Sequence, residues 1–285
     1  MVEEERQKFM PQKATRLIAK FHHSKKALAI PTTFIILFVT TLGLIAITYY
    51  FAVEKVNARG VTLKVASAKQ DMQEFGEVIS QVIGQPGSAR TFEFSDSGGK
   101  LHIQPSANTL TVNITDNGDI AATVFNQAIG QVVYELPYSD SPDTGLFLKG
   151  DSRTITNQSG ATQLYIRRGT EHAEIVLRYR PIASYTTAGV QDGKLVNNIR
   201  IYIINLNASE SIALFGKLPL KVCCISTQLT TTTYELSYIP ETLVLTSTLD
   251  EDSGRISIPL SSTAQGAIIN IELIICNITI QKWVK

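Results

Sequence analysis

Three cysteines carry the side chains of this chain that are best suited to covalent chemistry. Cys223 and Cys224 are neighbours in one segment that reads as a β-strand, and Cys276 lies in another. Because neighbouring side chains of a strand point to opposite faces, one of Cys223 and Cys224 is placed to form a disulfide with Cys276 while the other stays free. Buried free thiols are the alternative. No C-x-x-C spacing is present, which argues against a zinc or thioredoxin-like site.

Arginine and tyrosine form a second group of candidate residues. Its members are Tyr165, Arg167, Arg168, Arg178, Tyr179 and Arg180. On adjacent strands they would form a basic and aromatic face of the kind that binds nucleic acid or a sugar. A solvated strand face explains the same pattern, and we favour this interpretation. The net charge is +1, so there is no global basic field and no nucleic-acid partner is expected.

Two acidic stretches offer oxygen atoms of the kind that bind calcium. They are residues 140–143 and the run Asp250-Glu251-Asp252-Ser253-Gly254. Neither is followed by a bidentate glutamate at the required spacing, and hairpin turns rich in aspartate and glycine explain both equally well. We therefore expect neither a metal nor another cofactor.

The sequence lacks the common motifs of catalysis. It contains no G-x-S-x-G, no H-E-x-x-H and no phosphate-binding glycine loop. His102 and His172 follow the apolar segment described below, and neither has an evident partner in the sequence. The pattern favours a structural or binding protein over an enzyme.

Four N-x-S/T triplets are candidate glycosylation sites. Their asparagines are Asn113, Asn157, Asn207 and Asn277. A chain rich in serine and threonine also produces such triplets by chance, so we expect only some of them to be modified.

A long apolar segment determines on which side of a membrane these residues lie. Residues 27–53 contain no charged side chain, and about 20 apolar residues suffice to cross a bilayer as a helix. Basic residues are frequent in residues 1–26 and scarcer after the segment, which predicts a cytoplasmic leader or tail and an extracellular C-terminal part. A cleaved secretory signal fits less well, because its apolar core spans only about 7–15 residues.

The next segment, residues 54–84, predicts that the helix continues outside the membrane. Its apolar residues recur at alternating steps of four and three, which is one face of a helix. They are Val61, Val65, Ala68, Met72, Phe75, Ile79 and Val82. Lys64, Lys69, Asp71, Glu74 and Glu77 are expected on the opposite face. Gly84, Pro86 and Gly87 then end the helix.

From residue 88 to residue 285 the apolar period changes to two, which is typical of β-strands. Alternating or apolar runs recur, among them 110–115, 132–136, 164–167, 174–179, 199–206, 220–226, 234–238, 242–247, 255–259 and 268–282. Glycine- and aspartate-rich turns separate many of them. The pattern predicts an α+β protein in which a mainly antiparallel β-sandwich follows the helix, with an internal boundary between two β units at 183–195.

The segment Lys25-Lys26-Ala27-Leu28-Ala29, followed at once by the apolar run, resembles the processing site of type IV pilin-like proteins, particularly archaeal ones. The resemblance implies that a prepilin peptidase-like protease cuts after Ala27, so that Lys26 and Ala27 end the leader and Leu28 begins the mature chain. The long helix followed by a β domain also looks like this family. Thr32 stands where bacterial pilins place a glutamate, which fits archaeal members better.

The resemblance implies a minor or accessory pilin, a structural subunit of a surface filament or of a pseudopilus-like assembly. Its expected partners are the membrane, the protease and identical or related subunits. The alternative is a permanently anchored single-pass ectodomain that acts as an adhesin, a receptor or an accessory subunit of a membrane complex. Both hypotheses place the β domain, with its candidate glycans, outside the cell.

Overall fold

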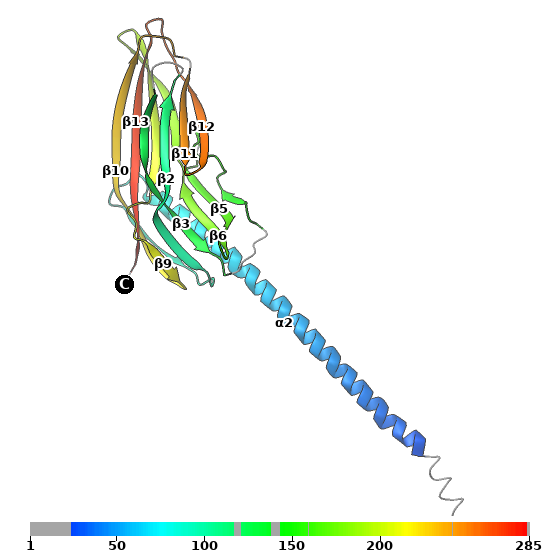
Figure 1. Ribbon diagram of the computed structural model, residues 1–285. Coiled ribbons are helices and arrows are strands. Elements are labelled where there is room, and N and C mark those ends of the chain that lie inside the picture. The colour runs from blue at the N-terminus through cyan, green and yellow to red at the C-terminus, as the bar shows by residue number, and fades with distance from the viewer. Residues whose placement is uncertain (1–23, 117–120, 138–142, 159, 241, 284–285) are drawn as a thin grey trace, which may run out of the picture. The chain divides into compact units, whose positions relative to one another are not determined.

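The computed structural model describes residues 24–116, 121–137, 143–158, 160–240 and 242–283 (Figure 1). Side chains are described from residue 31 onward, apart from that of Leu218. The chain divides into two compact units, of which one ends at Thr62 and the other runs from Leu63 to the C-terminus.

A single helix, α2 (Ser24–Val82), contributes to both units. In the first unit every residue from 31 to 59 is exposed, including large apolar side chains such as Phe34 and Leu44. Threonine hydroxyl groups within this stretch donate hydrogen bonds to carbonyl oxygens one turn earlier, as Thr41 does to Leu37 at 2.7 Å and Thr48 to Leu44 at 2.7 Å. The helix is therefore long and apolar enough to cross a membrane.

The second unit holds thirteen strands in two sheets, among the residues that the structure describes. The first sheet has the order β1 (Ala89–Phe94), β10 (Leu218–Leu236), β13 (Ala267–Lys282), β8 (Lys194–Asn205) and β7 (Ile182–Gln191). Here β13 and β8 run parallel, and the other neighbours run antiparallel.

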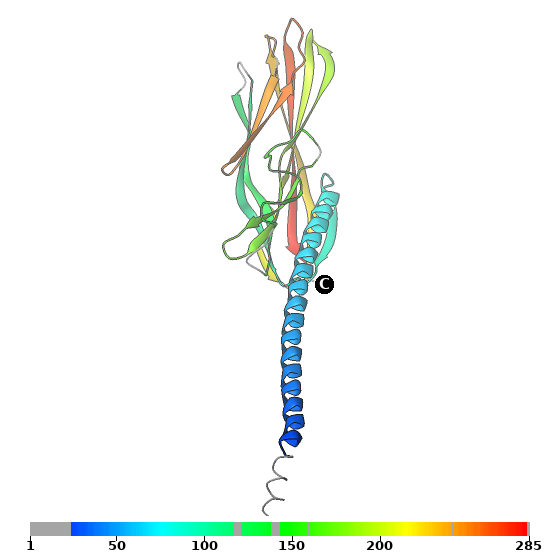
Figure 2. The ribbon, with the colours of Figure 1, turned by 90° about the vertical axis from the view of Figure 1, so that its right-hand side faces the viewer.

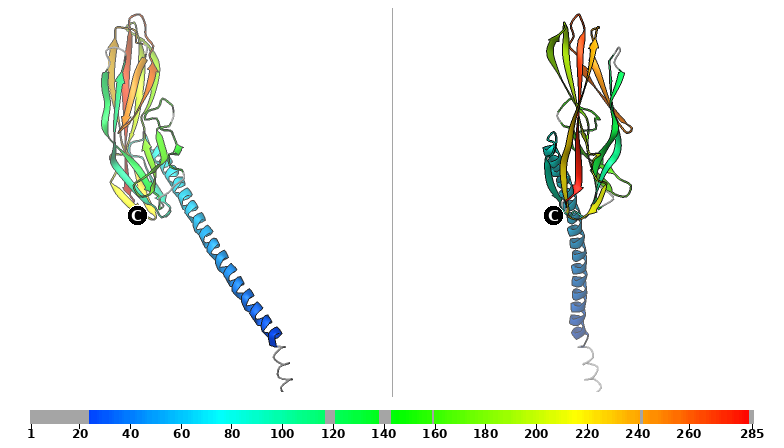
Figure 3. Two further views of the ribbon diagram at one scale, coloured as in Figure 1. Left: turned by 45° about the vertical axis from the view of Figure 1, so that its right-hand side comes forward. Right: turned by 90° about the vertical axis from the view of Figure 1, so that its left-hand side faces the viewer.

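The second sheet is antiparallel. Its order is β12 (Asp252–Pro259), β11 (Thr242–Leu249), β2 (Lys100–Thr115), β3 (Ala121–Glu135), β6 (Ala173–Tyr179), β5 (Thr162–Arg168) and β4 (Phe147–Lys149), and β9 (Ile212–Phe215) pairs with β2. Figure 3 shows the strands of both sheets running lengthwise through this unit. The expectation of an α+β chain with mostly antiparallel strands is confirmed.

The C-terminal turns of α2 belong to the core of the second unit, where they lie along the strands (Figure 2). Met72, Phe75 and Ile79 are fully buried in a cluster that contains residues of both sheets. The ring of Phe75 lies 5.0 Å from that of Phe94 between centroids. The apolar stripe predicted from residue spacing is therefore the buried face of the helix from Ala68 to Val82.

Asp71 departs from the predicted helix pattern, because it is buried instead of lying on the polar face. Its carboxylate accepts a hydrogen bond from the backbone N–H of Ser95 at 2.8 Å. Asp71 lies three residues after Ala68 and thus on the same helix face. The hydrogen bond offsets the cost of burying its charge and joins the helix to the end of β1.

A second buried cluster again takes its apolar residues from both sheets. Leu110, Val112 and Leu245 come from the second sheet, and Ile199 and Ile271 come from the first. Residues 183–195, expected to separate two β units, form the hairpin of β7 and β8 inside the unit that begins at Leu63.

Candidate functional site

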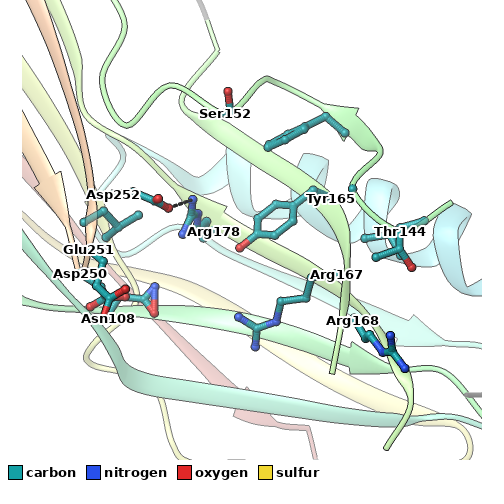
Figure 4. Close-up of a pocket in the computed structure, with 14 residues that line it drawn as sticks. Asn108, Thr144, Ser152, Tyr165, Arg167, Arg168, Arg178, Asp250, Glu251 and Asp252 are labelled. Carbon is teal, nitrogen blue, oxygen red and sulfur yellow. Dashed lines mark ion pairs between the residues drawn. The ribbon is translucent and has the colours of Figure 1, made fainter. Parts of the chain in front are cut away.

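A cavity of about 630 Å³ opens on the second sheet, next to the turn between β11 and β12 (Figure 4). Its lining combines the predicted arginine and tyrosine group with the acidic run that begins at Asp250. The sequence presented these two groups as unrelated. In the strand order, β2, β3 and β6 separate β11 from β5, so the two groups meet only in the folded sheet.

One wall of the cavity comes from three neighbouring strands. Phe147 of β4 is the Cα partner of Tyr165 of β5, and their ring centroids are 5.2 Å apart. Arg178 of β6 is the Cα partner of Gln163, and its guanidinium lies over the Tyr165 ring at 5.1 Å from the centroid. Residues two apart on a strand share a face, so Gln163, Tyr165 and Arg167 all face this side of β5.

The opposite wall is the turn that joins β11 to β12. Asp250 adopts a positive φ of 53°, which aspartate tolerates better than most residues. Its backbone N–H donates to the carbonyl of Thr109 at 3.1 Å, and its carboxylate accepts from the N–H of Thr109 at 2.9 Å. This pair of hydrogen bonds fixes the acidic turn to β2 beside Asn108, which also lines the cavity.

The charged side chains of the cavity are held in place by partners. Arg178 is largely buried, donates to the Gln163 side chain at 2.9 Å and lies 3.9 Å from the carboxylate of Asp252. Arg167 donates to Glu174 at 2.7 Å. Arg167 and Arg178 stand on one wall of the cavity, and Asp250, Glu251 and Asp252 line the other. Charges of both signs therefore line the cavity.

The fourth arginine of the predicted group lies outside this lining. The Arg180 side chain is only 2% exposed, forms an ion pair with Asp151 at 2.5 Å and donates to the carbonyl of Arg153 at 3.0 Å. Hydrogen bonds from Arg153 and Arg180 hold the pKa of the Asp151 carboxyl well below its usual range. Tyr179 is buried, and that burial raises its pKa.

The expectation of a solvated strand face is thus wrong for Arg178 and Arg180, which are buried. Both are buried because the chain supplies acceptors that satisfy their guanidinium groups. No pattern in the sequence pointed to Asn108, Phe147, Asp151 or Gln163, which complete these contacts.

The two histidines lie near one carboxylate of β3. His102 Nε2 is 3.2 Å from Glu135, and His172 Nε2 is 4.0 Å from the same side chain. The sequence showed no partner for either residue, and the structure supplies one. None of these three residues lines the cavity of Figure 4. In the part of the chain that the structure describes, no group of three or more His, Cys, Asp or Glu side chains could hold a metal ion.

Of the two neighbouring cysteines, Cys224 is the one that the structure places beside Cys276. The Sγ atoms of Cys224 and Cys276 lie 3.5 Å apart in the core, whereas Cys223 is half-buried. All three are free thiols. The backbone N–H of Gly84, just after α2, donates to the Cys276 Sγ at 3.5 Å, and burial raises the pKa of that thiol.

The candidate glycosylation sites fall in two kinds of surroundings. Asn157 and Asn207 are exposed outside strands, although Ser159 of the first triplet lies outside the described residues. Asn113 is half-buried in β2, and its side chain accepts a hydrogen bond from Thr123 at 2.8 Å. Asn277 is half-buried in β13, and its amide donates to Ser226 at 3.1 Å.

The predicted processing site lies at the start of α2. Lys26, Ala27 and Leu28 have helical backbone, and their side chains are not among those described. The leader upstream of residue 24 and residues 140–142 of the first acidic stretch also lie outside the described ranges.

Comparisons with protein-family models, with curated protein sequences and with solved structures give no significant match to this chain.

Proposed function

We propose that the chain is a pilin-like subunit, held in the cell membrane by α2 and able to enter a surface filament or a pseudopilus-like assembly. The observation that carries this proposal is the apolar surface of α2 between residues 31 and 59, which is exposed on all sides. Phe34, Ile35, Ile36 and Leu37 follow one another, and four consecutive residues of a helix point to all sides of it.

Such a surface is stable in two surroundings, namely lipid and a bundle of similar helices. In water, by contrast, the aromatic rings and branched side chains of this helix would be exposed to solvent, and exposure of apolar surface to water is unfavourable. In lipid the helix is an anchor, and in a filament the same side chains pack against neighbouring copies. The downstream turns, buried in the core from Ala68 to Val82, would transmit force from the helix to the β unit.

The proposal includes a topology and a processing step. The N-terminal leader lies in the cytoplasm, the β unit lies outside as a sandwich of its two sheets, and a prepilin peptidase-like protease removes residues 1–27. Lys25 and Lys26 before the apolar run support both, because basic residues remain on the cytoplasmic side. Glycans on exposed asparagines would accompany this location.

A permanently anchored ectodomain that acts as an adhesin or receptor is the second candidate. The cavity beside Tyr165 favours it, because a purely structural subunit requires no recess lined by fixed charges. This candidate predicts that residues 1–27 are retained and that the protein stays monomeric in detergent.

Mass spectrometry of the N-terminus of the protein isolated from its native membrane tests the first proposal. We expect Leu28 as the first residue of the mature chain. The variant Ala27→Trp should accumulate with its leader intact and should form no filaments. The control Ala46→Trp, inside the apolar segment, should still be cleaved. A surface protein that keeps residue 1 in the wild type contradicts the proposal.

A further inference from the structure

We propose that the cavity between Tyr165 and the Asp250 turn binds an uncharged glycan. This inference goes beyond the proposed function, because it depends neither on leader cleavage nor on filament assembly. Figure 4 shows side chains of β5 and β6 facing the acidic turn across open space. The volume of about 630 Å³ lies within the range of about 300–1,000 Å³ that is usual for small-molecule sites.

The charge of the lining argues for an uncharged ligand. An anionic ligand such as a nucleic-acid strand would approach Arg167 and Arg178 but would also face Asp250, Glu251 and Asp252 at the other wall. A cationic ligand would meet the reverse conflict. Fixed charges of both signs line the cavity, so a ligand that carries a net charge of either sign meets repulsion at one wall.

The donor and acceptor pattern of the cavity suits a polyol. Arginine side chains only donate hydrogen bonds, and ionised carboxylates only accept them. A sugar hydroxyl both donates and accepts, so adjacent hydroxyls on one ring can satisfy both walls at once. Asn108, on the same side as the acidic turn, offers both a donor and an acceptor.

The aromatic pair supplies the apolar contact that a sugar ring requires. The rings of Phe147 and Tyr165 lie 5.2 Å apart between centroids and are tilted by 32°, so they pack against each other in the lining of one wall. The C–H faces of a pyranose ring are apolar and pack on aromatic rings, whereas the hydroxyls around its edge stay free for hydrogen bonds.

The side chains of the cavity are already ordered in the free protein. Arg178 is fixed by Gln163, by the Tyr165 ring and by Asp252, and Arg167 is fixed by Glu174. Ordering a long side chain on binding costs about 0.5–1.5 kcal/mol, so a fixed lining avoids part of this cost. Arg178 therefore positions the aromatic wall as well as offering donors.

Isothermal titration of the full-length protein in lipid nanodiscs tests the inference. The probes are three neutral trisaccharides, namely maltotriose, mannotriose and triacetylchitotriose, and two anionic ligands, a hyaluronate tetrasaccharide and a single-stranded DNA decamer. We expect at least one neutral trisaccharide to bind with Kd below about 1 mM, and neither anionic ligand to bind as tightly.

Two variants and two matched controls locate the binding. Tyr165→Ala removes the aromatic wall and should weaken binding at least about tenfold, a change of about 1.4 kcal/mol. Glu251→Gln keeps the shape of an exposed side chain while removing an ionised acceptor, and should weaken binding several-fold. The controls Tyr185→Ala and Glu210→Gln change exposed residues outside the lining and should bind like the wild type.

Thermal unfolding of each variant separates loss of binding from loss of folding. If Tyr165→Ala does not fold, Glu251→Gln alone decides the outcome. The inference is overturned if no neutral trisaccharide binds, if an anionic ligand binds more tightly than all of them, or if folded Tyr165→Ala or Glu251→Gln binds like the wild type. None of these results bears on leader cleavage, so the proposed function is judged separately.

Discussion

Oxidation is expected to join Cys224 to Cys276 and to stabilise the β unit. Their Sγ atoms lie 3.5 Å apart, and a disulfide requires about 2.05 Å, so a small movement of two side chains suffices. With oxidised glutathione as the oxidant, the two thiols lose two protons and two electrons, and glutathione disulfide takes them up to become two glutathione thiols. Cys223 lies next to Cys224 on the opposite strand face and should stay free.

The size of the effect follows from the length of the closed loop. Cys224 and Cys276 are 52 positions apart, for which the chain-entropy model gives about 14 cal/mol/K, or about 4 kcal/mol at 25 °C. Drawing the sulfur atoms together costs part of this gain, so we expect about 3 kcal/mol. In a domain of this size that raises Tm by about 6–12 °C.

Peptide mapping of the alkylated protein, together with thermal unfolding before and after oxidation, measures both effects. Cys223→Ser should still form the bridge and gain stability, whereas Cys224→Ser should do neither. Burial raises the pKa of the Cys276 thiol, and exchange requires a thiolate, so oxidation should be slow at neutral pH and faster as the pH rises. A bridge through Cys223, or a Cys224–Cys276 bridge that lowers Tm, would refute the reasoning.

Two further predictions concern the packing of α2 and the buried arginine. Phe75→Ala should lower the free energy of unfolding by about 3–5 kcal/mol, because the ring is fully buried. The control Leu63→Ala, at an exposed helix position, should change this free energy by less than about 0.5 kcal/mol. Denaturant titrations measure both. Asp151→Asn leaves the Arg180 guanidinium without its carboxylate and should cost about 2 kcal/mol, less than for a fully buried pair because the Asp151 side chain is 42% exposed.

The pH dependence of stability distinguishes the Asp151 contribution from simple packing. The pKa of Asp151 is lower in the folded than in the unfolded protein, so its contribution is present above the unfolded pKa and is lost as the pH falls through that value toward the folded one. Unfolding free energies measured from pH 5 downward should fall less steeply in Asp151→Asn than in the wild type. Equal slopes would contradict the assignment.

The helix was readable from the sequence because two simple patterns coincide there. Residues 27–53 carry no charge, which is typical of a helix that crosses a membrane. The apolar stripe from Ala68 to Val82 is the face that the helix buries against the β unit. The error at Asp71 arose because charge was taken as a sign of exposure. A single backbone N–H, that of Ser95, is enough to make burial of this carboxylate acceptable, and no periodicity reveals it.

Strand continuity was harder to read from alternation. Residues 220–226 and 234–238 were expected as separate runs, but β10 extends without interruption from Leu218 to Leu236. The intervening threonines are polar, yet their β-branched side chains favour extended backbone. Thr230, Thr231, Thr232 and Thr233 are exposed, so alternation of polarity is lost there while the strand persists.

The cavity shows what a single sequence cannot supply. Tyr165 and Arg178 could be recognised as candidates, and so could the acidic run at Asp250. No pattern in the sequence indicated that the two groups lie close together. Their proximity depends on β2, whose Thr109 binds the Asp250 turn while the rest of the sheet leads to β5. Long-range strand order of this kind is a property of the whole fold and leaves no local signal.

The threonines of α2 have a consequence for the proposed transfer of this helix from lipid into a filament. The hydroxyls of Thr40, Thr41 and Thr48 are satisfied by carbonyl oxygens of the helix itself. Moving the helix from one apolar medium into another therefore breaks none of these hydrogen bonds, and these three hydroxyls keep their acceptors. These threonines therefore add no cost of broken hydrogen bonds to such a transfer, and selection among neighbouring helices depends mainly on the fit of side chains.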